Sequence, residues 1–137
     1  MIKFEQIIKM KISFHKVLLK KKFPLAISRG VKSENYNVFV KIEDEGIVAW
    51  GESSPGNSEG ADSAEEIISQ LNRLVNIGIQ NKSIYDLERI SREIKISPCA
   101  YAGLDIALWD LKAKKAKLAL HELLGLPLPK SMTSLTI

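Results

Sequence analysis

One arginine in the first third of the chain has the surroundings of a ligand contact. Arg29 lies between Ser28 and Gly30, in a stretch reading "KFPLAISRGVKSE" (22–34) that also contains Pro24. An arginine on a loop can hold a carboxylate through two parallel hydrogen bonds. Arg29 is therefore a candidate ligand contact for a carboxylate, and a solvated loop arginine is the alternative.

The charged residues are unevenly distributed along the chain. Residues 1–41 hold ten Lys or Arg against two acids, a net charge of +8, whereas the remainder holds ten against fourteen, a net charge of −4. The basic side chains gather at Lys16, Lys20, Lys21 and Lys22, which indicates either the solvent side of strands or a surface for an anionic partner. Few aromatic residues accompany them and no nucleic-acid-binding motif is found, so we predict no nucleic acid partner.

Other reactive side chains lack the neighbours that chemistry requires. His15 and His121 have no nearby nucleophile and no partner at metal-ligand spacing, and Cys99 is the single cysteine. The eight acids from Glu43 to Glu66 lack the regular alternation of a calcium loop. We therefore predict that this chain contributes no metal ligand and no catalytic residue.

The first half of the chain has the pattern of a small sheet. Residues 7–16 alternate loosely between apolar and polar types, which predicts a strand. Residues 35–52 are rich in β-branched and aromatic types around Gly46, which predicts a β-hairpin and, with the first strand, a three-stranded antiparallel sheet. The Gly- and Pro-containing stretches at 22–34 and 53–63 are predicted to be irregular connections.

The second half has the pattern of helices. Ser63, Ser83 and Ser97 each precede a run with apolar residues at helical spacing, and each is a predicted N-cap. The longest run carries Gly103 and Ala107 four residues apart, where a neighbouring backbone can approach closely. Strands followed by helices define an α+β fold, here a three-stranded antiparallel sheet followed by a helical layer.

The last residues do not fit this plan. "TSLTI" (133–137) reads as a strand without a partner, so we expect one domain over 1–127 and a linker with the first strand of another over 128–137. No apolar run approaches the roughly 20 residues that cross a bilayer, and no signal peptide is evident. We expect no membrane contact and a cytoplasmic location.

Several motifs occur together in a known order. They are "PLAISRG", "NVFVKIEDEGIVAWGE", "SSPGNSEGADS", "AGLDIALWDLKAKK" and "LHELLG". In this order the chain resembles the N-terminal capping domain of the enolase superfamily, in its muconate-lactonizing and mandelate-racemase branch. Within that branch it looks most like the dipeptide epimerases that act on Ala-Glu-type dipeptides.

The resemblance implies how the chain would work. In that family the capping domain precedes a modified TIM barrel, which carries the catalytic lysines and three acidic Mg²⁺ ligands; no position here corresponds to them. Mg²⁺ is thus implied for a longer enzyme only, and this chain alone is expected to be inactive. Two family loops that close over the barrel mouth match 23–33 and 53–61, which would place Arg29 and Ser28 near a small, carboxylate-bearing substrate.

Other readings stay open. Muconate cycloisomerases, o-succinylbenzoate synthases and N-acylamino acid racemases share this cap, so the resemblance leaves the reaction within the family undecided. A non-catalytic interaction module is a further alternative. A homo-oligomer is a further possibility that is compatible with the resemblance.

Overall fold

An antiparallel sheet forms the first layer of the molecule. In the computed structural model, which describes residues 10–27, 30–56, 58–128 and 130, the described strands pair in the order β1-β2-β3. They span β1 (Lys11–Ile27), β2 (Gly30–Asp44) and β3 (Ile47–Ser53). β2 is the middle strand and pairs antiparallel with both neighbours, so the predicted three-stranded antiparallel sheet is confirmed.

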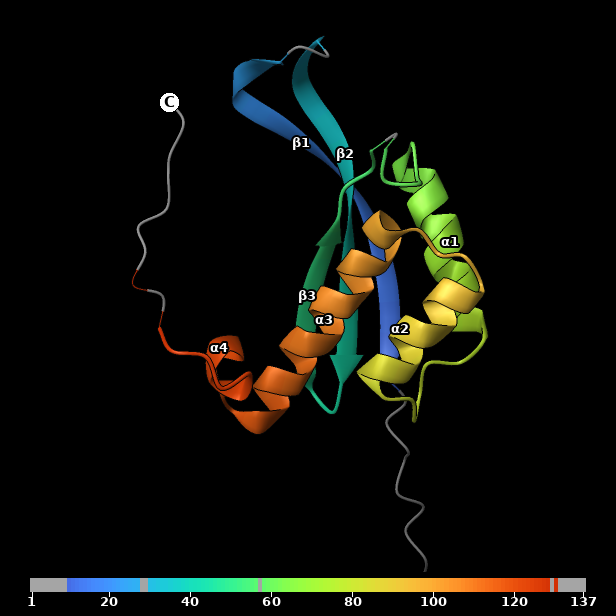
Figure 1. Cartoon of the computed structure of the whole chain (residues 1–137), viewed down its shortest axis with the longest axis vertical. Helices are drawn as coiled ribbons and strands as arrows, with labels where there is room; N and C mark the ends of the chain where they lie inside the picture. Colours follow the sequence, from blue (N-terminus) through green and yellow to red (C-terminus); the bar gives the residue numbers. More distant parts are fainter. Residues whose placement is uncertain (1–9, 28–29, 57, 129, 131–137) are drawn as a thin grey trace, which may run out of the picture.

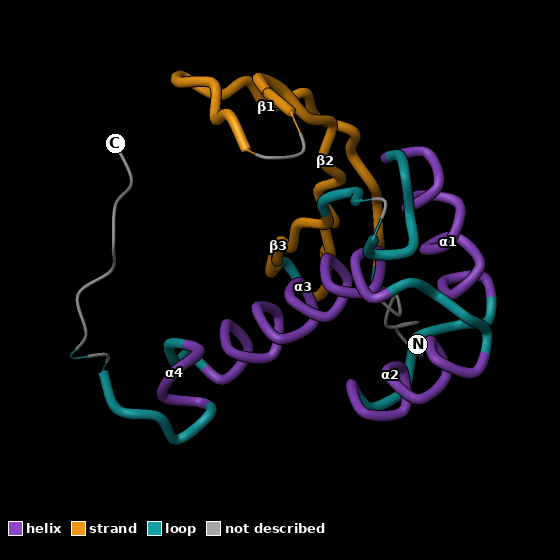
Figure 2. The backbone as a smooth tube through the Cα atoms, turned by 45° about the horizontal axis from the view of Figure 1, so that its top comes forward, coloured by secondary structure: helices purple, strands orange, loops and turns teal. Residues whose placement is uncertain are grey.

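A helical layer covers one face of this sheet (Figure 1). Its helices are α1 (Ala64–Asn76), α2 (Ile84–Glu93), α3 (Pro98–Ala116) and the short α4 (Leu120–Leu123). The predicted α+β class is therefore confirmed. Figure 2 shows α3 alongside β3, with α1 and α2 grouped together farther along the layer. The predicted strand at 133–137 lies outside the described residues.

The predicted caps begin the three longer helices. The hydroxyl oxygens of Ser63, Ser83 and Ser97 each accept a hydrogen bond from a backbone N–H in the first turn of α1, α2 and α3. Ser83 also forms a capping box with Asp86. Each bond satisfies an N–H that the helix itself leaves unpaired, which fixes where the helix begins.

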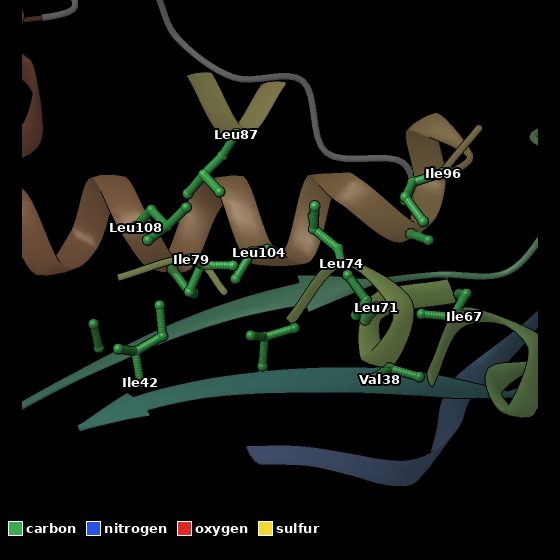
Figure 3. Packing of buried hydrophobic residues seen from close by; sticks show 14 of the residues in the cluster. Val38, Ile42, Ile67, Leu71, Leu74, Ile79, Leu87, Ile96, Leu104 and Leu108 are labelled. Atoms are coloured by element: carbon green, nitrogen blue, oxygen red, sulfur yellow. The ribbon is translucent and has the colours of Figure 1, made fainter. Parts of the chain in front are cut away.

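Buried aliphatic side chains join the two layers. Val38, Val40 and Ile42 alternate along β2 and are fully buried against residues of the helices. The helical partners shown in Figure 3 include Ile67, Leu71 and Leu74 of α1, Leu87 of α2, and Leu104 and Leu108 of α3. The apolar face of the strand, with its period of 2 residues, thus packs against the apolar faces of the helices, with their period of 3.6 residues.

The turn between β2 and β3 follows the predicted hairpin. Asp44 pairs with Ile47, and the two residues between them, Glu45 and Gly46, have φ of 50° and 79°. Positive φ at both central positions is the geometry of a type I′ turn, whose twist matches that of the strands. Gly46 adopts it without steric cost.

The prediction of an irregular connection over 22–34 is wrong. β1 continues to Ile27 and β2 begins at Gly30, and these two residues are paired. The register is interrupted between Lys20 and Leu25, the interval that contains Pro24. Because β1 is an edge strand, a proline there need not remove a ladder hydrogen bond, and the hairpin continues past it.

The backbones of α3 and β3 lie so close together that no side chain fits between them at Gly51. A Cβ added to Gly51 would lie 1.9 Å from the carbonyl oxygen of Gly103 and 2.8 Å from the amide nitrogen of Ala107. The buried Ser53 hydroxyl donates to the Ala100 carbonyl and accepts from the Gly103 N–H, each at 3.0 Å. The close approach predicted from Gly103 and Ala107 is confirmed.

The same helix also satisfies the outer edge of β3. The Asp110 carboxylate accepts a hydrogen bond from the Trp50 backbone N–H at 2.9 Å. Lys114 donates to the Val48 carbonyl at 2.9 Å and to Asp110 at 2.7 Å. The Asp110–Lys114 ion pair therefore also occupies backbone groups that an edge strand would otherwise leave open.

We expect Gly51→Ala to destabilise the chain by about 3 kcal/mol or more, because its methyl group would overlap the α3 backbone and force the layers apart. At a strand position without such a close contact, a change from glycine to alanine would stabilise the strand, because alanine loses less backbone entropy than glycine on folding. Chemical denaturation followed by circular dichroism measures the change.

Gly56→Ala is the matched control. Its added Cβ would meet the flexible Glu59 side chain, 3.1 Å away. Equal stability of the Gly51→Ala and Gly56→Ala variants would contradict the close-packing account.

Candidate functional site

A hollow of about 400 Å³ lies where the β1–β2 hairpin meets the residues that follow β3. Its lining is mixed in charge and polarity, with ammonium, carboxylate, amide and hydroxyl groups beside two apolar side chains. The lining residues are Leu19, Lys20 and Lys21 of β1, Glu34, Asn35 and Asn37 of β2, and Ser54 and Pro55 after β3. Ser54 and Pro55 belong to the predicted covering loop at 53–61, and Lys21 and Glu34 flank the predicted covering loop at 23–33.

A chain of side-chain hydrogen bonds forms one wall of the hollow. The Asn35 amide nitrogen donates to the Asn37 carbonyl oxygen at 2.7 Å and to the Ser54 hydroxyl at 3.0 Å. The Asn37 amide nitrogen in turn donates to the Glu52 carboxylate at 2.6 Å. Asn37 is 8% exposed, so these bonds offset the cost of burying its amide. The chain connects β2, β3 and the following loop.

The loop after β3 is closed on itself. The Gly56 N–H donates to the Ala61 carbonyl at 2.9 Å, and the Glu59 N–H donates to the Gly56 carbonyl at 2.8 Å. Ala61 is buried, whereas Ser58 and Glu59 are exposed. The described part of this loop, 54–56 and 58–62, therefore has a fixed base and an exposed tip.

A buried glutamine ties this loop to the helices. The Gln70 amide nitrogen donates to the Gly60 carbonyl at 3.2 Å, and its carbonyl oxygen accepts from the Ser97 N–H at 2.7 Å. Gln70 is 9% exposed and projects from α1. One side chain thus holds the end of the loop against the start of α3.

The structure divides the predicted basic cluster. Lys16 points to the helical layer, where it pairs with Glu65 of α1 and lies 4.2 Å from the centre of the Tyr36 ring. The hydrogen bond between them raises the pKa of the Lys16 ammonium and lowers the pKa of the Glu65 carboxyl. Lys20 and Lys21 line the hollow instead, so the cluster does not form a single binding face.

Other sequence candidates occupy structural positions. The His15 ring lies 5.9 Å from the Trp50 ring, between centroids, and Cys99 packs against the core. Glu66 accepts from the Asp62 N–H beside its helix start. In the residues that the structure describes, no group of three or more His, Cys, Asp or Glu side chains could hold a metal ion.

Arg29 and Ser28, the predicted substrate contacts, lie outside the described residues. The described strands end at Ile27 and begin again at Gly30 on either side of them. Among the described helices, none combines the length and the apolar character needed to cross a membrane.

Sequence reasoning missed the amide side chains of the site. Asn35 and Asn37 are two residues apart in a strand and so share a face, a signal that was available in "NYNVF". Gln70 is a polar residue within the apolar stripe of α1, and such a position also marks a buried hydrogen-bonding role. The partners, Ser54 and Gly60, come from other segments and could not be inferred locally.

Comparison with known proteins places this arrangement in a family. Residues 9–125 match the model of the mandelate racemase / muconate lactonizing enzyme N-terminal domain. The chain is 53% identical over 128 residues to a hydrophobic dipeptide epimerase of Flavobacteria bacterium (strain MS024-2A), covering 93% of this chain and 37% of that protein. It is 33% identical over 111 residues to the L-Ala-D/L-Glu epimerase of Escherichia coli (strain K12), covering 80% and 32%.

A solved structure agrees with these sequence matches. A dipeptide epimerase from Cytophaga hutchinsonii, complexed with Mg and the dipeptide D-Ala-L-Val, superposes with a TM-score of 0.75 at 28% identity, covering 88% of this chain and 33% of that one. The chain belongs to the mandelate racemase / muconate lactonizing enzyme family of the enolase superfamily, as its N-terminal domain. It spans about a third of the length of the relatives it matches.

We expect Gln70→Met to destabilise the chain by about 1–3 kcal/mol, because methionine fills the space but leaves the Ser97 N–H and the Gly60 carbonyl without this partner. Thermal unfolding measures the loss. Gln80→Met, at an exposed position, is the control, and equal unfolding temperatures of the two variants would refute the anchoring role.

Proposed function

We propose that this chain is the substrate-covering domain of a dipeptide epimerase, with hydrophobic dipeptides as its first candidate substrates. The observation that carries the proposal is the 53% identity over 93% of the chain to a hydrophobic dipeptide epimerase. The hollow lies next to the two segments, 23–33 and 53–61, that the family resemblance assigns to covering the substrate: Lys21 and Glu34 flank the first segment, and Ser54 and Pro55 belong to the second. The role of the two segments would be to exclude water and contact the distal part of the dipeptide.

The reaction itself belongs to residues beyond this chain. Epimerisation moves the proton on a carbon next to a carbonyl group, and Mg²⁺ supplies charge stabilisation for such chemistry when bound. The described residues do not fit a magnesium site, since they offer no group of three side chains able to hold a metal ion. As the family resemblance implies, we propose that Mg²⁺ and the proton-transferring groups belong to the remaining two-thirds of a longer protein, with 1–127 as the capping domain and 128–137 as the connection.

Exposed apolar side chains support a docking surface for that remainder. Leu120, Leu124, Leu126 and Leu128 are 42%, 46%, 56% and 69% exposed along the segment that leads towards the C-terminus. Several exposed leucines along one segment are consistent with an interaction surface. We propose that the rest of a longer protein covers them.

Arg29, with Ser28 beside it, is the proposed contact for a substrate carboxylate. It favours a second candidate substrate, Ala-Glu-type dipeptides, because an ionised side chain needs a charged partner once water is excluded. The 33% identity to an L-Ala-D/L-Glu epimerase is consistent with that alternative.

The purified 137-residue chain should not exchange the α-proton of a dipeptide. Incubation with Mg²⁺ and L-Ala-L-Leu or L-Ala-L-Glu in deuterated water, followed by NMR, should show no deuterium uptake above buffer. The longer protein that carries this chain should exchange at least one of the two. Exchange by the 137-residue chain itself would refute the division of labour, and no exchange of any dipeptide by the longer protein would refute the proposed function.

In the longer protein, Arg29→Ala should lower kcat/KM for L-Ala-L-Glu by roughly tenfold or more, because a hydrogen bond to a charged group contributes about 1.5–3 kcal/mol. Arg29→Lys should recover part of the loss, since lysine cannot form the bidentate contact. L-Ala-L-Leu is the control substrate. Equal losses for the two dipeptides would mean that Arg29 shapes its segment and does not contact a side-chain carboxylate.

A further inference from the structure

We propose that Asn35 is a positioning residue that couples the β1–β2 hairpin to the loop after β3, so that both segments cover the substrate as one unit. The part of the proposal that concerns a substrate rests on the proposed function. The coupling between the two segments is argued from the geometry alone. It concerns the hydrogen-bonded wall of the hollow and assigns no catalytic role to it.

Asn35 occupies the place where regular pairing of the hairpin ends. It pairs with Leu19, and the next pair, Glu34 with Lys20, is the last before the register is interrupted. The hairpin resumes with Leu25 opposite Lys32, and Figure 1 shows this distal part extending beyond the helical layer. A contact at this base controls the direction in which the distal hairpin leaves the sheet.

The amide of Asn35 reaches across to the other segment from that base. One of its hydrogens goes to Asn37 in the same strand and the other to the Ser54 hydroxyl, the first residue after β3. The Asn37 amide is oriented by the Glu52 carboxylate, which leaves its carbonyl oxygen facing Asn35. The donor direction of Asn35 is therefore set by the sheet.

Both ends of the loop have further anchors, and Ser53 is also paired with Val38 of β2. Ser53 is bonded to two backbone groups of α3, and Gly60 is bonded to Gln70 of α1. These anchors hold the loop against the helical layer and the body of the sheet, whereas the bond from Asn35 to Ser54 links the loop to the base of the distal hairpin, beyond the Val38–Ser53 pair. Removing that bond should leave the fold intact and free the two segments to move separately.

Amide hydrogen exchange of the 137-residue chain tests the coupling without any activity. In Asn35→Ala, and in Asn35→Leu, which keeps a side chain of similar size but has no polar atom, exchange at the Gly56 and Glu59 amides should accelerate several-fold. Rates are taken relative to the amide of buried Leu104, so that global destabilisation does not imitate the effect. Asn72→Ala, at an exposed position of α1, is the matched control.

Kinetics of the longer protein test the consequence for the substrate. A net hydrogen bond of about 0.5–1.5 kcal/mol predicts a rise in KM of roughly twofold to tenfold in Asn35→Ala, with little change in kcat. Adding Ser54→Ala should have little further effect, because both substitutions remove the same bond.

Unchanged relative exchange at Gly56 and Glu59 in both Asn35 variants would overturn the coupling. Accelerated exchange with KM equal to that of Asn72→Ala would overturn its role in holding the substrate. If the longer protein acts on no dipeptide, the proposed function fails, and the exchange result alone then decides whether the coupling exists.

Discussion

The contact between Gly51 and Gly103 is the constraint on which the rest of the structure depends. It brings the backbones of β3 and α3 close enough for the Ser53 hydroxyl to bond two backbone groups of α3, and for Asp110 and Lys114 to reach the strand edge. With a side chain at either glycine, α3 would be displaced outwards. The helix would then lose those polar contacts together with its packing on the sheet.

This contact also decides where the candidate site can form. The loop after β3 starts at Ser53 and returns to the start of α1, so its two ends are set by how α1 and α3 lie against the sheet. Gln70 closes the arrangement by joining the loop to the first residues of α3. The hollow beside the hairpin therefore depends on how α1 and α3 are placed, although its lining residues come from the strands and the loop after β3.

Local sequence signals predicted the elements better than their extents. The three serine caps, the Gly46 turn and the apolar stripes are decided within a few residues, and each was predicted correctly. The continuation of β1 past Pro24 was not predicted. A proline is tolerated there because β1 is an edge strand, with a neighbouring strand on one side only, and the local sequence does not reveal that position in the sheet. The site behaves likewise: Asn35 and Asn37 share a face by local periodicity, but Ser54 joins them through the pairing of β2 with β3, which no local pattern specifies.

The occupied edge of β3 has a consequence for how copies of this domain could associate. Sheets extend from molecule to molecule by strand addition, and endless growth requires an open edge at both sides of each sheet. Here the Trp50 N–H and the Val48 carbonyl are already bonded to α3, and the opposite edge strand, β1, carries Lys20, Lys21 and Lys22. In the part of the chain that the structure describes, strand addition at Val48 and Trp50 would therefore have to break the bonds to α3, which disfavours continuous growth of a sheet through both edges.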